Sequence, residues 1–224
     1  GRLREAGVDR IVERPLGVDV AAFHPDHGDR DAVRRELGVK AGEHLLVFAG
    51  RAAKEKNVDV IIAAVEKLGA PYRLLLIGAA DGLPIDSERV ISLPFQQDTR
   101  AVARLLASSD AFVHANEKEP FGLCALEAMA CGLPVVCTSH GGVSETVDDS
   151  VGVKSISLKI ADYAGAIEAL FARDLEAMQV AARQKAVTRY AWATVFEELC
   201  MVYADVSGVR AFLEPAEFDD QATQ

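Results

Sequence analysis

Short, almost wholly apolar runs alternate with amphipathic helical patterns, and this alternation constrains the fold more than any other feature of the sequence. The spacing predicts strands over residues 44–49, 73–77, 90–93, 111–115, 134–137 and 153–158. It predicts helices over residues 57–68, with Asn57 as the N-cap, and over 99–107, 122–130, 159–172, 174–190 and 192–206. Such alternation requires right-handed crossovers, and uniformly apolar strands indicate a sheet that is covered on both faces. We therefore expect an α/β domain with a parallel sheet and helices on both faces, plus C-terminal helices.

Composition and charge exclude several classes of protein. Apolar residues make up 50% of the 224 residues, which is enough for a full core, and the net charge of −10 argues against a broad nucleic-acid footprint. No apolar run approaches the roughly 18 residues that span a bilayer, and no signal-peptide pattern opens the chain. The four cysteines form no CxxC pair and are expected to be reduced, buried thiols of a cytoplasmic protein.

The loop after residues 44–49 combines a glycine with basic side chains. Gly50 allows close approach of the backbone, and Arg51, Lys54 and Lys56 follow just before a predicted helix. Ligands of parallel sheets bind beyond the carboxyl ends of the strands, where cations and free helix N–H groups favour a phosphate. The alternative is a solvated, charged turn.

Two glutamates follow the strand at residues 111–115. Glu119 lies in the loop, and Glu127 lies eight positions later, about two helical turns away and on the same side. A carboxylate within an Ala-, Leu- and Met-rich helix is costly to bury unless hydroxyl or cationic groups pair with it. Glu127 is therefore a candidate for ligand binding; the alternatives are a partly exposed helix residue or a partner of a core Lys or Arg.

Weaker motifs have simpler interpretations. The turn at residues 141–142 is a second anion-binding candidate, or an ordinary turn. Asp29 and Asp31 are interpreted as helix-capping residues rather than as metal ligands, and we expect no metal site. His114 is interpreted as a core histidine with its hydrogen bonds satisfied, although it lies at the ligand end of a strand.

Three segments together resemble a known family. Residues 113–147 closely resemble the C-terminal domain of the group 1 family of retaining nucleotide-sugar glycosyltransferases, whose signature is two glutamates separated by seven residues, here Glu119 and Glu127. Residues 49–65 resemble the family's basic element, with Arg51 and Lys56, and residues 14–25 resemble its interdomain linker. The resemblance implies the GT-B fold, in which two Rossmann-like domains enclose the active site, and it makes this chain the C-terminal half.

The resemblance also implies a role for each matching residue. The substrate would be a nucleoside-diphosphate sugar, bound without a metal or other cofactor. Glu119 would be the catalytic residue that reaches hydroxyls of the transferred sugar, and Glu127 would hold the ribose. The donor diphosphate would be held by Gly50, Arg51, Lys56, Phe121, Gly122 and Leu123, and the base by Leu93, Pro94 and Phe95. The segment 78–82 lacks the family's usual GxGP ending.

The same resemblance suggests a division of the chain. Residues 1–27 would be a remnant of the N-terminal domain with the linker, residues 28–190 the Rossmann-like domain that binds the nucleotide sugar, and residues 191–224 a crossover helix with an acidic tail. The partner would be the missing N-terminal domain, without which we expect no catalysis. The alternatives are a sugar-nucleotide epimerase of the same architecture and a non-catalytic binding module.

The C-terminal helix carries an apolar face that needs a partner. We expect this face either to pack against the body of the domain or to pair with a second copy of the chain. It comprises Trp192, Val195, Phe196, Leu199, Val202 and Tyr203.

Overall fold

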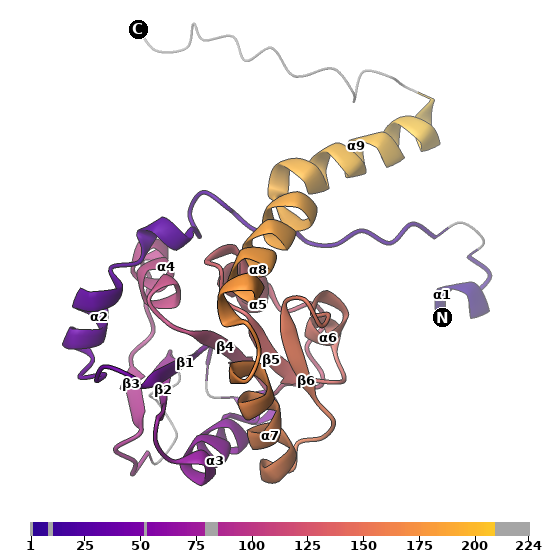
Figure 1. Ribbon diagram of the computed structural model, residues 1–224. Helices are drawn as coiled ribbons and strands as arrows, with labels where there is room; N and C mark the ends of the chain where they lie inside the picture. Colours follow the sequence, from indigo (N-terminus) through magenta and orange to yellow (C-terminus); the bar gives the residue numbers. More distant parts are fainter. Residues whose placement is uncertain (1, 9–10, 52, 79–84, 209–224) are drawn as a thin grey trace, which may run out of the picture.

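The computed structural model describes residues 2–8, 11–51, 53–78 and 85–208, and its centre is a single six-stranded sheet (Figure 1). All neighbouring strands are parallel, in the order β3-β2-β1-β4-β5-β6. The order reverses between β1 and β4, which is the place where such sheets open a crevice at their carboxyl ends. The strands are β1 (His44–Ala49), β2 (Tyr72–Ile77), β3 (Val90–Leu93), β4 (Ala111–His114), β5 (Val135–Thr138) and β6 (Gly152–Ser155).

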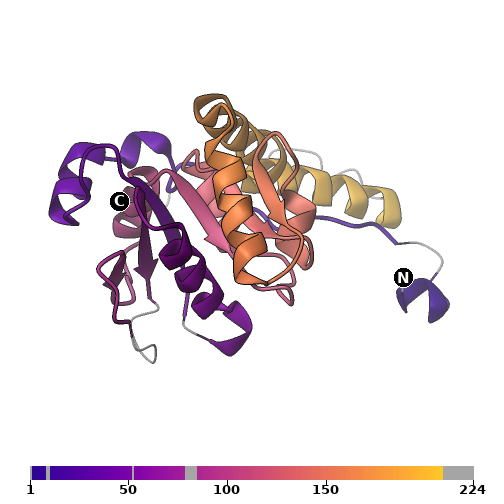
Figure 2. The same ribbon diagram turned by 60° about the horizontal axis from the view of Figure 1, so that its bottom comes forward.

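Helices cover both faces of the sheet, as the apolar strands predicted (Figure 2). Alternate residues of β1 enter different cores: Leu45 and Val47 pack on one face, and Leu46 and Phe48 pack on the other. The first face is covered by α4 (Thr99–Ala107), α5 (Leu123–Ala130) and α8 (Leu175–Tyr190), and the second by α3 (Val58–Leu68) and α7 (Ile160–Phe171). The expectation of a Rossmann-like parallel sheet is confirmed.

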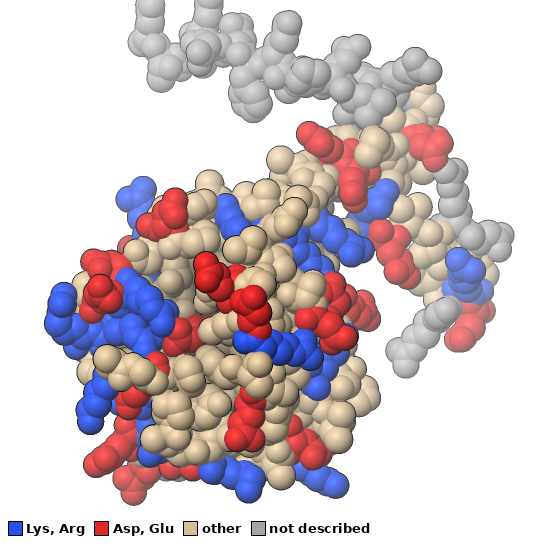
Figure 3. All heavy atoms as spheres, viewed as in Figure 1, with Lys and Arg blue, Asp and Glu red and all other residues tan. Residues whose placement is uncertain are grey.

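The remaining elements are mostly short. They are α1 (Arg2–Glu5), η1 (Pro25–His27), α2 (Arg30–Glu36), η2 (Lys54–Lys56), α6 (Gly142–Thr146) and the longer α9 (Trp192–Ser207). In the described part of the chain, no helix combines the length and the apolar character needed to cross a membrane. On the face shown in Figure 3, Lys and Arg gather over α2 and otherwise alternate with Asp and Glu.

Local corrections concern one strand and one cap. Strand β6 ends at Ser155, three residues earlier than expected, because the Ser155 hydroxyl donates to the Ser157 carbonyl at 2.7 Å and the chain turns toward α7. Asn57 precedes α3 but its side chain accepts no bond from the helix. It donates instead to the Ala115 carbonyl at 2.8 Å, so it ties the loop after β1 to the end of β4. Asp29 does cap α2, accepting from the Ala32 amide.

The four cysteines are free thiols. Cys131 and Cys137 are buried as expected, and burial raises the pKa of each thiol to about 12. Cys124 and Cys200 are only partly buried, which corrects the expectation for these two.

Residues 18–23 are hydrogen-bonded to the body of the domain. The Val18 amide donates to the Tyr190 carbonyl at 2.7 Å, which joins this segment to the end of α8. One guanidinium, that of Arg183 in α8, donates to the carbonyls of Val20, Phe23 and Ala130 at 2.7–3.0 Å. The division of the chain at residues 27 and 190 stays a prediction.

Helix α9 extends away from the sheet and its covering helices (Figure 1). Of the predicted apolar face, Val195 is buried, whereas Phe196 and Tyr203 are each about half exposed. Packing of the whole apolar face against the domain body is therefore wrong, because the extended backbone of Ala191 redirects the chain between α8 and α9. Self-association through this face stays a prediction.

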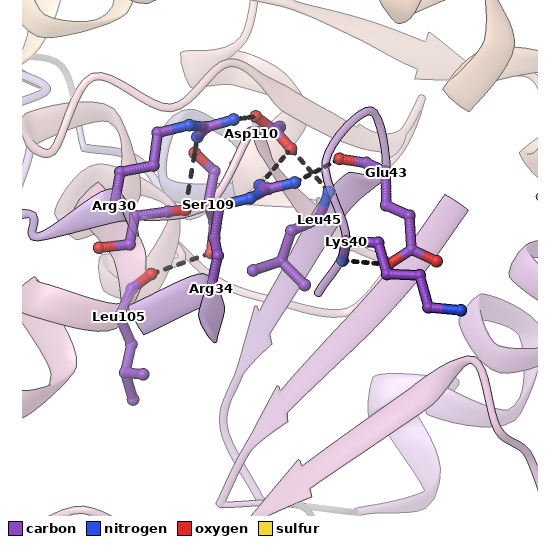
Figure 4. A network of polar contacts seen from close by, with 9 residues as sticks. Arg30, Arg34, Lys40, Glu43, Leu45, Leu105, Ser109 and Asp110 are labelled. Atoms are coloured by element: carbon purple, nitrogen blue, oxygen red, sulfur yellow. Dashed lines mark hydrogen bonds and ion pairs between the residues drawn. The ribbon is translucent and has the colours of Figure 1, made fainter. Parts of the chain in front are cut away.

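A buried carboxylate organises the amino end of the sheet (Figure 4). Asp110 precedes β4, is only 4% exposed, and accepts from the Leu45 amide at 2.7 Å and from Arg34 at 3.0 Å. Arg30 donates to its other oxygen, and Arg34 also donates to the Glu43 carbonyl. One carboxylate thus fixes α2 against the starts of β1 and β4.

Replacing this carboxylate should destabilise the fold. Asp110→Ala leaves the largely buried Arg34 guanidinium without its anion and the Leu45 amide without an acceptor. We expect the free energy of unfolding, measured in urea, to fall by about 3–5 kcal/mol. Glu36→Ala breaks the exposed pair with Arg104 and is the control. Equal unfolding midpoints for the two variants would contradict the organising role of Asp110.

Candidate functional site

The loops after β1 and β4 meet where the strand order reverses. Lys56, at the end of η2, donates to Oε2 of Glu119, which lies 63 positions later in the chain. Asn116 donates to the same oxygen at 3.1 Å. The Asn57 side chain also links the two loops, because it donates to the Ala115 carbonyl. The crevice therefore contains a fixed cation and a fixed carboxylate side by side.

Glu119 is held by one oxygen and offers the other. Both hydrogen bonds reach Oε2, and Oε1 has no partner among the described residues. Burial raises the pKa of Glu119, but the hydrogen bond and charge of Lys56, with the bond from Asn116, lower it overall. The side chain is an oriented carboxylate at neutral pH, suited to accept from the hydroxyl groups of a ligand.

His114 departs from the expectation of a satisfied core histidine. The ring is 1% exposed, and neither nitrogen has a hydrogen-bond partner in the described part of the chain. The Glu119 carboxylate is 3.7 Å from Nε2, too far for a hydrogen bond. Burial lowers the pKa of His114 to about 4, with the charge of Lys56 adding to the effect and that of Glu119 opposing it. The imidazole is therefore neutral at pH 7.

The turn before α5 presents free backbone donors. Gly122 has a φ of 88°, and a Cβ there would lie 2.2 Å from a methyl group of Val143. The amides of Phe121, Gly122 and Leu123 form no hydrogen bond with any described residue. At the start of an eight-residue helix, such amides and the helix dipole favour an anion.

The glycines at residues 141–142 have a structural task. The Gly142 amide donates to the Glu119 carbonyl at 2.7 Å, so the interpretation of this amide as free for an anion is wrong. A Cβ on Gly142 would lie 2.2 Å from the Pro120 carbonyl oxygen. The turn instead supports the loop that carries Glu119.

Glu127 lines a hollow whose lining includes neither Lys56 nor Glu119. Together with Leu123, Arg100 and Trp192 it lines a cavity of about 1100 Å³. Burial raises the pKa of its carboxyl, and no Lys or Arg among the described residues pairs with it. The structure therefore excludes the alternative of a core ion pair within that part of the chain.

The remaining predicted residues border the crevice. Arg51 is exposed and forms no ion pair with the residues described. A Cβ on Gly78 would lie 3.4 Å from the Gly50 carbonyl oxygen and 3.5 Å from the ring of Phe95, so the residues that follow β1 and β3 both approach the end of β2. The Phe95 ring is 70% exposed. Leu93 ends β3, and Pro94 follows it; residues 79–82 of the loop after β2 lie outside the described residues.

The sequence patterns did not predict that Asn116 donates to Glu119 or that the His114 ring is unpaired. The available signal was the polar pair itself, because His114 and Asn116 flank the end of an otherwise apolar strand at the ligand edge. Within residues 2–8, 11–51, 53–78 and 85–208, no three His, Cys, Asp or Glu side chains gather as metal ligands would.

Comparisons with known proteins identify the family of the chain. A family model described as "Glycosyl transferases group 1" matches residues 29–187. The D-inositol 3-phosphate glycosyltransferase of Xylanimonas cellulosilytica is 33% identical over 92% of this chain and 54% of its own length. The chain spans about half the length of the curated relatives it matches.

Solved structures share the fold. The C-terminal domain of a group 1 family glycosyl transferase from Francisella tularensis aligns with a TM-score of 0.64 and 23% identity, over 79% of this chain and all of that domain. HepE of Anabaena, solved in complex with UDP and glucose, aligns with a TM-score of 0.70 and 24% identity, over 84% of this chain and 55% of its own.

The depressed pKa of His114 predicts how stability depends on pH. Below pH 6.5 the unfolded chain binds a proton that the folded chain binds only near pH 4, so the free energy of unfolding falls across this window. The full shift corresponds to about 3 kcal/mol. His114→Leu should flatten this fall, measured by urea unfolding from pH 7 to pH 4.

His140→Leu, at an exposed position, controls for the loss of an imidazole as such. A His114→Leu protein whose stability falls with pH as steeply as that of the wild type would contradict the assignment.

Proposed function

The chain belongs to the glycosyl transferases group 1 family, and from this premise we propose that it binds the nucleotide-sugar donor of a retaining glycosyltransferase. The complete enzyme would transfer a sugar from a nucleoside diphosphate to an acceptor, and this chain alone would not. The observation that carries the proposal is Glu119, whose carboxylate is anchored beside Lys56 at the strand reversal while Oε1 stays available.

The diphosphate would lie between basic side chains and the turn before α5. Arg51 and Lys56 supply positive charge at the edge of Gly50, and the amides of residues 121–123 supply hydrogen-bond donors. When the bond to the sugar breaks, negative charge develops on the leaving diphosphate. Donors that are already in place stabilise this charge, and the residues present do so without a metal.

The two glutamates would contact different parts of the donor. Glu119 Oε1 would accept from hydroxyls of the transferred sugar, which makes Glu119 the catalytic residue of the chain. Glu127, at the 1100 Å³ cavity, would accept from both ribose hydroxyls. Glu127 is partly exposed, and the raised pKa of its carboxyl supports this role, since two hydroxyl donors would compensate the partial burial of the carboxylate.

The base would contact the end of β3. Leu93, Pro94 and Phe95 follow one another there, and the exposed Phe95 ring offers a flat apolar surface. The complex of Anabaena HepE with UDP makes UDP the first ligand to test.

Calorimetry tests the proposal directly. UDP, GDP and ADP are titrated into the chain with and without EDTA, and we expect one of them to bind in both conditions. Failure of all three to bind would refute the donor site, and binding that EDTA abolishes would refute the metal-free mode.

Arg51→Ala should weaken diphosphate binding by about 1.5–3 kcal/mol, the usual contribution of a hydrogen bond to a charged group. Lys67→Ala, exposed at the far end of α3, is the matched control and should bind as the wild type does. Calorimetry with the bare diphosphate measures both. Unchanged affinity in Arg51→Ala would remove Arg51 from the phosphate site.

The two glutamates should give different binding profiles. Glu127→Gln should weaken UDP and UDP-glucose alike, because both contain the ribose. Glu119→Gln should leave UDP nearly unaffected and lower the affinity for UDP-glucose relative to UDP. The same loss on bare UDP in both variants would contradict the division of roles.

A further inference from the structure

His114 is the buried side chain of the ligand edge that the proposed function leaves without a task. It ends β4, its ring is 1% exposed, and both ring nitrogens lack a partner among the described residues. Buried polar groups are nearly always paired, so an unpaired imidazole at this position requires an explanation.

Crowding at one oxygen explains why Nε2 of the imidazole is unpaired. Nε2 lies 3.7 Å from Oε2 of Glu119, and that oxygen already accepts from Lys56 and from Asn116. A carboxylate oxygen has two lone-pair directions, and both are taken. His114 Nε2 could therefore donate to Oε2 only if Lys56 left that oxygen.

In the proposed function, a second anion, the diphosphate, competes with Glu119 for Lys56. A diphosphate carries more negative charge than a carboxylate, and its arrival would draw the Lys56 ammonium toward it. Oε2 of Glu119 would then lose one of its two donors while the side chain stays largely buried. An under-bonded carboxylate oxygen at this depth needs a replacement donor.

We propose that His114 is a positioning residue that replaces Lys56 as a hydrogen-bond donor to Glu119 Oε2 when a diphosphate binds. The inference rests on the proposed function, because Lys56 must engage the phosphate. The imidazole acts as its neutral Nε2–H tautomer, and no proton is transferred. Glu119 thereby keeps Oε1 aimed at the sugar while Lys56 serves the phosphate. The low pKa of His114 agrees with a neutral ring.

Nitrogen-15 NMR of the His114 ring tests the exchange. Adding UDP to the wild-type chain should shift the Nε2–H resonance in the direction of a stronger hydrogen bond. Lys56→Met should produce the same shift without nucleotide, because it removes the competing donor permanently. An Nδ1–H tautomer in the complex, or an unchanged ring signal in Lys56→Met, would overturn the inference.

Binding measurements separate positioning from core packing. His114→Leu keeps most of the volume but no donor, and His114→Gln keeps a donor at a similar reach. We expect His114→Leu to retain UDP affinity and to lose roughly tenfold in the preference for UDP-glucose over UDP, with His114→Gln restoring most of it. Equal preference in both variants and the wild type would overturn the inference.

The outcomes distinguish this inference from the proposed function. If wild-type protein does not bind UDP or another nucleoside diphosphate, both fail. If UDP binds and the His114 signal stays unchanged, the donor site stands and the role of His114 is refuted. The NMR experiment on wild-type protein also covers the case in which a His114 variant does not fold.

Discussion

The reversal of strand order between β1 and β4 is the constraint on which the ligand edge depends. Because β2 and β3 extend from one side of β1 and β5 and β6 from the other side of β4, the loops after β1 and β4 diverge and leave space between them. Lys56 and Glu119 meet across that space. Helices on both faces make the strands apolar, so polar groups gather at the strand ends, where ligands have access.

The two glutamates have the same side chain, but their surroundings shift the two pKa values in opposite directions. Glu119 lies beside a cation, which holds its pKa below the usual range. Glu127, eight positions later in an apolar helix, has no cation among the described residues, and burial raises its pKa. Glu119 is ionised and oriented before a ligand arrives. The ionised form of Glu127 would be stabilised most by a ligand that donates two hydroxyl hydrogen bonds.

Much of the fold was predictable because its signals are local. Apolar runs predicted the bounds of β1 and β3 to the residue, and an amphipathic pattern did the same for α4. Basic or acidic residues after strands marked Lys56 and Glu119. What failed depends on partners distant in sequence. Nothing near Asn57 indicates that its amide meets the Ala115 carbonyl, and nothing near Gly142 indicates the Glu119 carbonyl. His114 belongs to the same class, since Nε2 has no place at Glu119 Oε2 while Lys56, from a distant loop, and Asn116 donate to that oxygen.

The guanidinium of Arg183 joins parts of the molecule that are far apart in the sequence. It grips the segment at residues 18–23 and also the Ala130 carbonyl, which ends α5. Helix α5 is a rod of eight residues, about 12 Å long, and its other end is the turn at Gly122. One side chain therefore joins residues 18–23 to the carboxyl end of the helix whose amino end carries the free amides of the turn at Gly122. Lysine would not reproduce this arrangement, because the three carbonyls accept from two nitrogens of a planar guanidinium, whereas lysine offers a single ammonium nitrogen.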